Sequence, residues 1–301
     1  MGDVMSTSRP GNFHGVLPAL VTPMAVDGSV DERELARLVE HLIAAGVHGL
    51  VPLGSTGEYY ALTNAERERV LRVVLEAAAG RVPVVAGSNA GSTADVVSHA
   101  RLAETLGCAG VLLPAPYYSR PAPDELFAHF RTVSDAIGIP IMVYNYPGRT
   151  GVDMLPEWVA ELSRLKNVRY IKDSTGDMTR ISSLKRLCGD QLGVFCGCDT
   201  LAFESFAVGA CGWVSGVPNF TPRSFVKLYQ LTVEQRDYDA ARALYFKMLP
   251  LLNYAESGRY TQLVKAGCAL RGFKVGAPRA PLYAVSTEAE ATLREVLADL
   301  D

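Results

Sequence analysis

Lys172 is the residue whose position in this sequence says most about chemistry. It closes the apolar run Val168-Arg-Tyr-Ile-Lys172, and lysine is rarely buried without a partner or a task. Burial disfavours the ammonium form, lowers the pKa of the side chain and leaves a free amine that can attack a carbonyl. The sequence equally allows a lysine that extends into solvent or pairs with Asp173. Both interpretations stay open at this level.

Two tyrosines and one glycine-bounded turn also stand at the ends of apolar runs. Tyr144 and Tyr118 carry phenols, which can pass a proton in a desolvated pocket, although each taken singly is more typical of a core or rim aromatic. The segment Gly54-Ser55-Thr56-Gly57 offers two hydroxyls and flexible backbone N–H groups. Such a turn suits a carboxylate or an oxyanion, and taken alone it is an ordinary turn between a strand and a helix.

Short and nearly continuous apolar runs must position these residues. Each is too short and too uniform for an amphipathic helix, so we expect strands buried on both faces of a parallel sheet. The eight runs are Val16–Leu20, Gly49–Leu53, Val82–Ala86, Gly110–Leu113, Pro140–Tyr144, Val168–Ile171, Gly193–Cys196 and Gly212–Ser215.

Helical segments alternate with these runs. Three of them begin with capping-box spelling, at Ser29-Val-Asp-Glu32, Thr63-Asn-Ala-Glu66 and Ser92-Thr-Ala-Asp95. Eight strand-helix repeats favour an α/β fold of the (β/α)8 TIM barrel type, although a doubly wound open sheet uses the same elements. In a barrel, the residues that do chemistry gather at the C-terminal ends of the strands.

The pattern becomes purely helical after the eighth run. We expect helices over Pro222–Glu234, Asp237–Tyr254, Gln262–Arg271 and Thr287–Leu300. The predicted division is a flexible N-terminal tail at 1–12, the barrel at 13–221 and a C-terminal helical extension at 222–301. Because no Ser/Gly linker or charge run separates the last two parts, the extension is expected to pack on the barrel.

The composition excludes several classes of protein. The chain has 301 residues, 49% of them hydrophobic, and a net charge of −3, which gives no broad field to attract nucleic acid or an acidic membrane. Its apolar runs are far shorter than the roughly 20 residues of a membrane helix. Six dilute cysteines and the lack of a secretory leader predict a cytoplasmic protein with free thiols.

Metal and nucleotide chemistry find little support in the sequence. The histidines fall before strands or within helices, so the expected mouth of the barrel lacks imidazole ligands; they are His14, His41, His48, His99 and His129. Cys196-Gly-Cys198 has no second cysteine pair at a zinc spacing, and no G-x-G-x-x-G segment is present. We therefore expect no metal site.

Four motifs, in order along the chain, resemble those of the dihydrodipicolinate synthase / N-acetylneuraminate lyase family of class I aldolases. They are Gly54-Ser-Thr-Gly-Glu58, Pro116-Tyr-Tyr-Ser-Arg-Pro121, Tyr144-Asn-Tyr-Pro-Gly-Arg-Thr-Gly151 and Ile171-Lys-Asp-Ser-Thr-Gly176. Any one of them is a weak signal, but four at family spacing are a strong one. The resemblance spans the whole predicted barrel.

The resemblance implies a role for each candidate residue. Lys172 would form a Schiff base with pyruvate or another 2-oxo acid, and Tyr144 would move protons. Thr56 would link Tyr144 to Tyr118, which in this family reaches the site of a neighbouring subunit. Further substrate contacts would come from Ser55, Thr56, Arg149, Gly197 and Val214. The resemblance also implies a homo-oligomer, a dimer usually paired into a tetramer, and no cofactor.

The nominal activity implied is condensation of pyruvate with aspartate semialdehyde, favoured by Arg149, as in 4-hydroxy-tetrahydrodipicolinate synthase. Three features depart from the synthase pattern. Ser55 replaces the threonine usual in synthases, and Tyr59 and Tyr60 are bulky where lysine-sensitive synthases have small residues. The segment Glu256–Gln262 stands where synthases typically carry an Asn-Pro-containing segment. They resemble catabolic paralogues of the same mechanism, such as 1-pyrroline-4-hydroxy-2-carboxylate deaminase, keto-deoxy sugar acid aldolases or N-acetylneuraminate lyase. A non-catalytic barrel that only binds a 2-oxo acid is a more remote alternative.

Overall fold

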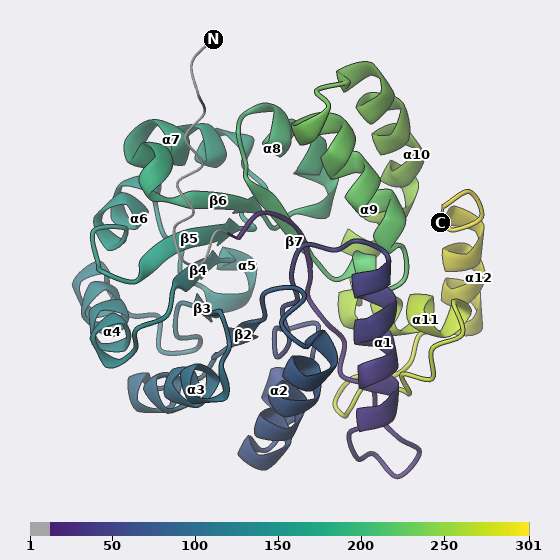
Figure 1. Cartoon of the computed structure of the whole chain (residues 1–301), viewed down its shortest axis with the longest axis horizontal. Coiled ribbons are helices and arrows are strands. Elements are labelled where there is room, and N and C mark those ends of the chain that lie inside the picture. Colours follow the sequence, from purple (N-terminus) through teal and green to yellow (C-terminus); the bar gives the residue numbers. More distant parts are fainter. Residues whose placement is uncertain (1–12, 301) are drawn as a thin grey trace.

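Residues 13–300 are described by the computed structural model, and the predicted tail at 1–12 lies outside them. Seven parallel strands within this range form one curled sheet in the order β1-β7-β6-β5-β4-β3-β2 (Figure 1). The strands are β1 (Gly15–Pro18), β2 (Val85–Gly87), β3 (Gly110–Pro114), β4 (Ile141–Asn145), β5 (Val168–Asp173), β6 (Gly193–Cys196) and β7 (Gly212–Ser215). The α/β class with a parallel sheet is therefore confirmed.

The predicted second strand, at 49–53, appears only as isolated bridges. Leu50 pairs in parallel with Val84, and Val51 pairs in parallel with Ala19. These bridges place the segment between the two edge strands, β1 and β2. Pro52 lacks an N–H to extend the ladder, and the next residue, Leu53, has a positive φ of 60°. A longer regular strand does not form here.

Two hydrophobic cores lie on the two faces of the sheet. Alternate strand residues such as Leu17, Met142 and Phe195 form the smaller inner cluster, because successive side chains of a strand point to opposite faces. Their neighbours, such as Val16, Val143 and Val194, belong to the larger cluster between sheet and helices. Position along the strand thus decides which side chains face the interior.

Helices cover the outer face, and Figure 1 shows them arranged around the sheet. Those between the strands are α1 (Glu32–Ala44), α2 (Asn64–Ala78), α3 (Thr93–Leu106), α4 (Pro123–Ala136), α5 (Pro147–Thr150), α6 (Pro156–Leu162), α7 (Met178–Cys188) and α8 (Ala202–Ala207). Short 3-10 turns lie at Tyr59–Ala61, Gly189–Gln191, Asp199–Leu201 and Val217–Asn219.

Two of the three predicted helix starts are confirmed. Thr63 closes a capping box with Glu66, and the Ser92 side chain accepts the N–H of Asp95. The third prediction is wrong in position. α1 begins after Asp31, whose carboxylate accepts the N–H of Glu34, because Ser29 donates its hydroxyl to Asp27 instead.

The C-terminal helices lie together beside α1 in Figure 1. They are α9 (Pro222–Tyr229), the π-helical turn Gln230–Glu234, α10 (Tyr238–Glu256), α11 (Tyr260–Leu270) and α12 (Thr287–Val296). Trp213 of β7 stacks on Phe225 of α9 with ring centroids 4.0 Å apart. No helix within residues 13–300 combines the length and the apolar character that crossing a membrane requires.

A buried ion pair joins α11 to the loop after the second apolar run. Lys265 Nζ lies 2.6 Å from Glu58 Oε1, and both side chains are almost fully buried. The lysine also donates to the Ala277 carbonyl at 3.1 Å, and Glu58 accepts the N–H of Arg279 at 2.7 Å. The buried ion pair and its hydrogen bonds therefore hold the C-terminal segment against the sheet.

Candidate active site

Lys172 lies at the C-terminal end of β5 and is 7% exposed. Its Nζ is 4.4 Å from the centroid of the Tyr144 ring, and it forms no ion pair with any residue of 13–300 within the usual distance. Burial lowers the pKa of Lys172 to about 8, with the Asp199 carboxylate acting in the opposite direction. The alternatives of a solvated lysine or a pair with Asp173 are both wrong for this structure.

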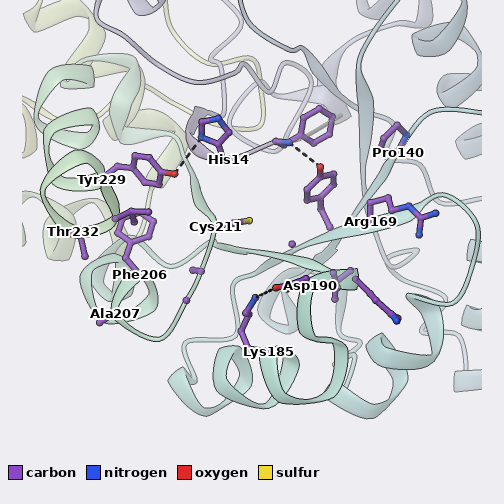
Figure 2. Close-up of a pocket in the computed structure, with 18 of the residues that line it drawn as sticks. His14, Pro140, Arg169, Lys185, Asp190, Phe206, Ala207, Cys211, Tyr229 and Thr232 are labelled. Carbon is purple, nitrogen blue, oxygen red and sulfur yellow. Dashed lines mark hydrogen bonds and ion pairs between the residues drawn. The ribbon is translucent and has the colours of Figure 1, made fainter. Parts of the chain in front are cut away.

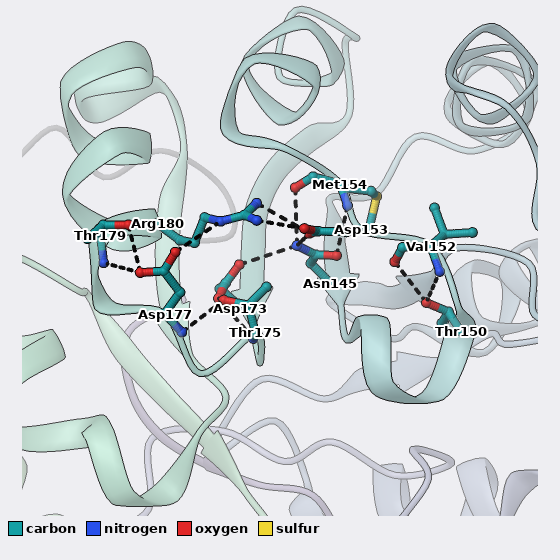
Figure 3. Close-up of polar contacts among 10 residues, drawn as sticks. All are labelled: Asn145, Thr150, Val152, Asp153, Met154, Asp173, Thr175, Asp177, Thr179 and Arg180. Atoms are coloured by element: carbon teal, nitrogen blue, oxygen red, sulfur yellow. Dashed lines mark hydrogen bonds and ion pairs between the residues drawn. The ribbon is translucent and has the colours of Figure 1, made fainter.

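Asp173 instead belongs to a network on the other face of the sheet, drawn in Figure 3. It accepts the hydroxyl of Thr175 at 2.6 Å and the amide of Asn145 at 3.5 Å. Asn145 also donates to Asp153 at 3.3 Å, and Asp153 is paired with Arg180 at 2.6 Å. Because Asn145 follows Tyr144 and Asp173 follows Lys172, this network fixes the two strand ends that carry Tyr144 and Lys172.

Tyr144 faces Lys172 from the neighbouring strand. The two residues are register partners in the β4 and β5 ladder, so their side chains emerge on the same face of the sheet. Burial raises the pKa of Tyr144 to about 12, while the Arg149 guanidinium opposes the rise. The phenol therefore holds its proton at neutral pH and can lend it to a reacting group.

The turn at 54–57 brings Ser55 and Thr56 to the same cavity, which has a volume of about 350 Å3. The turn is held in place because the Thr22 hydroxyl donates to the Gly57 carbonyl at 2.7 Å. Gly57 has no room for a side chain, since a Cβ would lie 2.8 Å from the Leu20 carbonyl oxygen. Two hydroxyls are thus presented by a rigid turn.

Gly197 and Val214 line the cavity as predicted. A Cβ on Gly197 would lie 2.8 Å from Lys172 Cε and 2.0 Å from the Ser174 hydroxyl. Any larger residue would therefore displace the lysine. Val214 belongs to the inner hydrophobic cluster and provides an apolar wall that keeps water from the amine.

Arg149 also lines the cavity, from the single-turn helix α5. Its guanidinium lies 5.5 Å from the ring centroid of Tyr146 and forms no ion pair with any carboxylate of residues 13–300 within 4 Å. Its positive charge adds to the effects that lower the Lys172 pKa. An unpaired guanidinium beside a cavity is suited to binding a carboxylate.

Tyr118 is the one predicted site residue that stands apart from the cavity. It has a positive φ of 71°, its surface is 96% exposed, and it is absent from the cavity wall. A single chain therefore does not bring it to Thr56 or Tyr144, and its predicted role requires a second copy.

Ten residues of the cavity wall were not assigned to the site by sequence reasoning. Six of them follow strand ends and are Tyr146, Ser174, Thr175, Gly176, Cys198 and Gly216. The other four come from the junction of α10 and α11 and are Glu256, Gly258, Arg259 and Tyr260. The sequence did show that this segment departs from the synthase pattern, but it did not show that the segment lies at the cavity. Asp199 was missed as well, although it stands among the polar residues at the strand ends.

A larger cavity, of about 910 Å3, opens at the opposite end of the sheet. It is lined by residues that precede the strands, among them His14, Pro140 and Cys211, which Figure 2 shows with their neighbours. None of the predicted site residues lies there. In addition, no cluster of His, Cys, Asp and Glu suited to a metal occurs within the described range.

Known proteins resemble this chain over nearly its full length. The profile described as "Dihydrodipicolinate synthetase family" matches residues 12–300. A 4-hydroxy-tetrahydrodipicolinate synthase of Pelobacter propionicus is 40% identical, with 95% of this chain and 98% of that protein covered. One of Methanospirillum hungatei is 37% identical, with 96% and 100% covered.

Solved structures agree with the sequence relatives. A dihydrodipicolinate synthase of Thermotoga maritima has a TM-score of 0.91 at 34% identity, with 95% of this chain and 98% of the other covered. One of Acinetobacter baumannii, solved in complex with pyruvate, has a TM-score of 0.92 at 32% identity, with 95% and 98% covered. The predicted resemblance and enzyme class are thereby confirmed, and this chain belongs to the dihydrodipicolinate synthetase family of lyases.

Proposed function

We propose that this chain joins pyruvate to aspartate semialdehyde through an imine on Lys172, the reaction for which its relatives are named. The observation that carries the proposal is the buried, unpaired Lys172 amine beside the Tyr144 phenol. With a pKa of about 8, roughly a tenth of the amine is unprotonated at pH 7. An ordinary lysine would be unprotonated about three hundred times less often.

The first step is attack of the Lys172 nitrogen on the carbonyl carbon of pyruvate. The C–N bond forms as the carbonyl π bond opens, and the oxygen takes a proton to give a carbinolamine. A second proton, from Tyr144, allows this oxygen to leave as water, and the C=N bond forms. The Tyr144 ring lies beside Lys172, with its centroid 4.4 Å from Nζ, and its phenol holds its proton at neutral pH.

The second step uses the protonated imine as an electron sink. The phenolate that the first step leaves on Tyr144 takes a proton from the methyl carbon, which gives an enamine whose carbon attacks the aldehyde carbon and forms the new C–C bond. The aldehyde oxygen takes a proton from Tyr144. Water then adds to the imine, the C–N bond breaks and Lys172 is regenerated, so that no cofactor enters the balance.

The rest of the cavity serves to hold carboxylates. Ser55 and Thr56 would bind the carboxylate next to the reacting carbonyl, with the wall of Gly197 and Val214 behind it. Arg149 would bind the carboxylate of the second substrate, because its guanidinium is not committed to an ion pair with another described residue.

The finer architecture is part of the same proposal. The bridges of Leu50 and Val51 support a closed (β/α)8 barrel at 13–221 in which their segment is the second strand. The helices at 222–301 form an extension packed on it. The exposed Tyr118 supports a homo-oligomer, a dimer of dimers, in which this phenol completes the proton path through Thr56 of another copy. The cysteines are free thiols, which supports a reducing compartment such as the cytoplasm.

Borohydride reduction in the presence of pyruvate tests the imine. The hydride converts C=N to a stable amine, so the peptide containing Lys172 should gain the mass of one reduced pyruvate adduct. Lys172→Ala should show no adduct while its circular dichroism spectrum is unchanged. Wild-type protein without an adduct would leave only a barrel that binds 2-oxo acids, and the enzymatic proposal would be wrong.

A second candidate is a catabolic enzyme of the same mechanism that cleaves, dehydrates or deaminates a 2-oxo acid. It is supported by the segment Glu256–Tyr260, which lines the cavity where the sequence departs from the synthase pattern. A coupled assay with pyruvate and aspartate semialdehyde separates the two candidates. Imine trapping without turnover at saturating concentrations of both substrates would select the catabolic enzyme.

A further inference from the structure

The segment between α10 and α11 is a fixed part of the cavity wall. Glu256 accepts the N–H of Asp199 at 2.5 Å and the hydroxyl of Thr200 at 2.7 Å. Four residues later, Tyr260 donates its hydroxyl to Asp199 at 2.5 Å and accepts the N–H of Gly216 at 2.9 Å. Both ends of the segment are therefore anchored to the strand ends that surround Lys172.

Arg259 lies between these anchors and remains uncommitted. Its backbone is left-handed, with φ of 54°, it lies at the exposed rim of the cavity that contains Lys172, and no carboxylate within residues 13–300 lies in ion-pair range of it. Glu256, the nearest acid in sequence, already accepts two hydrogen bonds. A guanidinium at the rim of a cavity, without a counter-ion, is suited to an anionic ligand that extends out of the cavity.

We propose that Arg259 is a specificity-determining residue that binds, together with Arg149, the distal carboxylate of the substrate joined to Lys172. The inference rests on the proposed imine chemistry. Arg149 comes from α5 and Arg259 from the α10–α11 junction, so two elements remote in sequence place positive charge in one cavity. Ser55 and Thr56 bind the carboxylate beside the imine, and the two arginines select chains that end in a second carboxylate.

Imine trapping with two 2-oxo acids of equal length tests this proposal without knowledge of the second substrate. 2-Oxopimelate ends in a carboxylate and has the chain length of the condensation product, whereas 2-oxoheptanoate ends in a methyl group. The wild type should reach half-maximal trapping at a concentration of 2-oxopimelate about 10- to 100-fold lower than that of 2-oxoheptanoate, the range expected for one charge-assisted contact.

Three variants separate the role of Arg259 from general effects. Arg259→Gln should reduce the preference at least about tenfold, and Arg259→Lys should keep most of it because the charge remains. Arg236→Gln is the matched control: Arg236 also has a left-handed backbone, with φ of 56°, and lines the cavity at the other end of the sheet. Arg236→Gln should leave the preference for 2-oxopimelate over 2-oxoheptanoate unchanged.

Imine trapping with pyruvate distinguishes failure of the Arg259 assignment from failure of the proposed imine chemistry. Half-maximal trapping by pyruvate should be the same in the wild type and all three variants, since pyruvate has no distal group. An Arg259→Gln protein with the preference of the wild type would overturn the assignment of Arg259 alone. A wild type without any preference would overturn the carboxylate-binding role of both arginines. A wild type that traps no pyruvate would overturn the imine and this assignment with it.

Discussion

Lys172 and Lys265 are both buried, with 7% and 2% of their surface exposed, but only Lys265 has a carboxylate in contact. Glu58 lies 2.6 Å from its ammonium. The Tyr144 ring centroid lies 4.4 Å from Lys172 Nζ, while the Asp199 and Arg149 charges act on Lys172 without an ion-pair contact. Burial lowers the pKa of both amines, and at Lys265 the Glu58 charge and hydrogen bond oppose it.

The difference between the two lysines shows how the surroundings of a buried amine decide whether it suits a structural or a chemical role. A carboxylate in contact stabilises the ammonium and makes the lysine a structural group, whereas desolvation without contact leaves the neutral amine accessible. The same turn contributes to both environments, because Glu58 stands two residues after Thr56. Burial alone therefore does not identify the reactive lysine.

Replacing each lysine by methionine tests the contrast between Lys172 and Lys265 most directly. Lys172→Met should lower turnover by about four orders of magnitude or more, because no side chain remains to form the covalent intermediate. It should also raise the free energy of unfolding by about 1–3 kcal/mol, since a buried polar group without an ion-pair partner is removed. Steady-state kinetics and urea unfolding measure both effects. A destabilised Lys172→Met would contradict the assignment of an uncompensated amine.

Tyr144→Phe tests whether the neighbour of Lys172 does chemistry. The ring and its packing remain while the phenol proton is lost, so turnover should fall by about two to four orders of magnitude. The free energy of unfolding should change little, because the hydroxyl faces the cavity and its removal leaves the ring packing intact. Turnover near the wild-type rate would exclude Tyr144 as the proton carrier.

Lys265→Met should reverse the pattern seen at Lys172. Loss of the ammonium leaves the Glu58 carboxylate buried and unpaired, so the free energy of unfolding should fall by about 3–5 kcal/mol. Imine trapping at low temperature should persist in the fraction that stays folded. Adding Glu58→Gln to Lys265→Met should restore part of the lost stability, because the buried charge is removed as well. A double variant no more stable than the single one would show that the pair is not coupled.

The sequence predicted the site on the strands better than the site on the connections. Lys172, Tyr144 and Val214 follow from apolar runs whose period of two fixes which side chains face inward. The same reasoning could not place Arg259, because the position of a helix junction over a cavity depends on contacts from Glu256 and Tyr260 to distant strands. Such long-range contacts leave no local pattern in the chain.

Boundaries show the same limit on a smaller scale. The apolar run at 49–53 has the composition of a strand, but Pro52 and the positive φ of Leu53 reduce its pairing to single bridges. The capping spelling at Ser29 is correct as a pattern, yet Asp31 caps α1. In both places a competing local hydrogen-bond requirement decided the outcome. The role of Tyr118 depends on another copy of the chain, which one sequence describes only by resemblance.

The smallest expected effect concerns pH and distinguishes the two lysines by their titration. Below pH 8 the amine of Lys172 becomes protonated, so the rate of imine trapping should fall about tenfold for each pH unit between 7 and 5. Burial and the neighbouring Glu256 raise the pKa of Asp199 to about 6, so this carboxylate is charged where Lys172 titrates. It therefore stabilises the ammonium. Asp199→Asn should move the midpoint of the trapping profile to lower pH, by less than about one unit. Asn keeps the shape and one acceptor for Trp213, and a midpoint moved to higher pH would contradict the sign of this coupling.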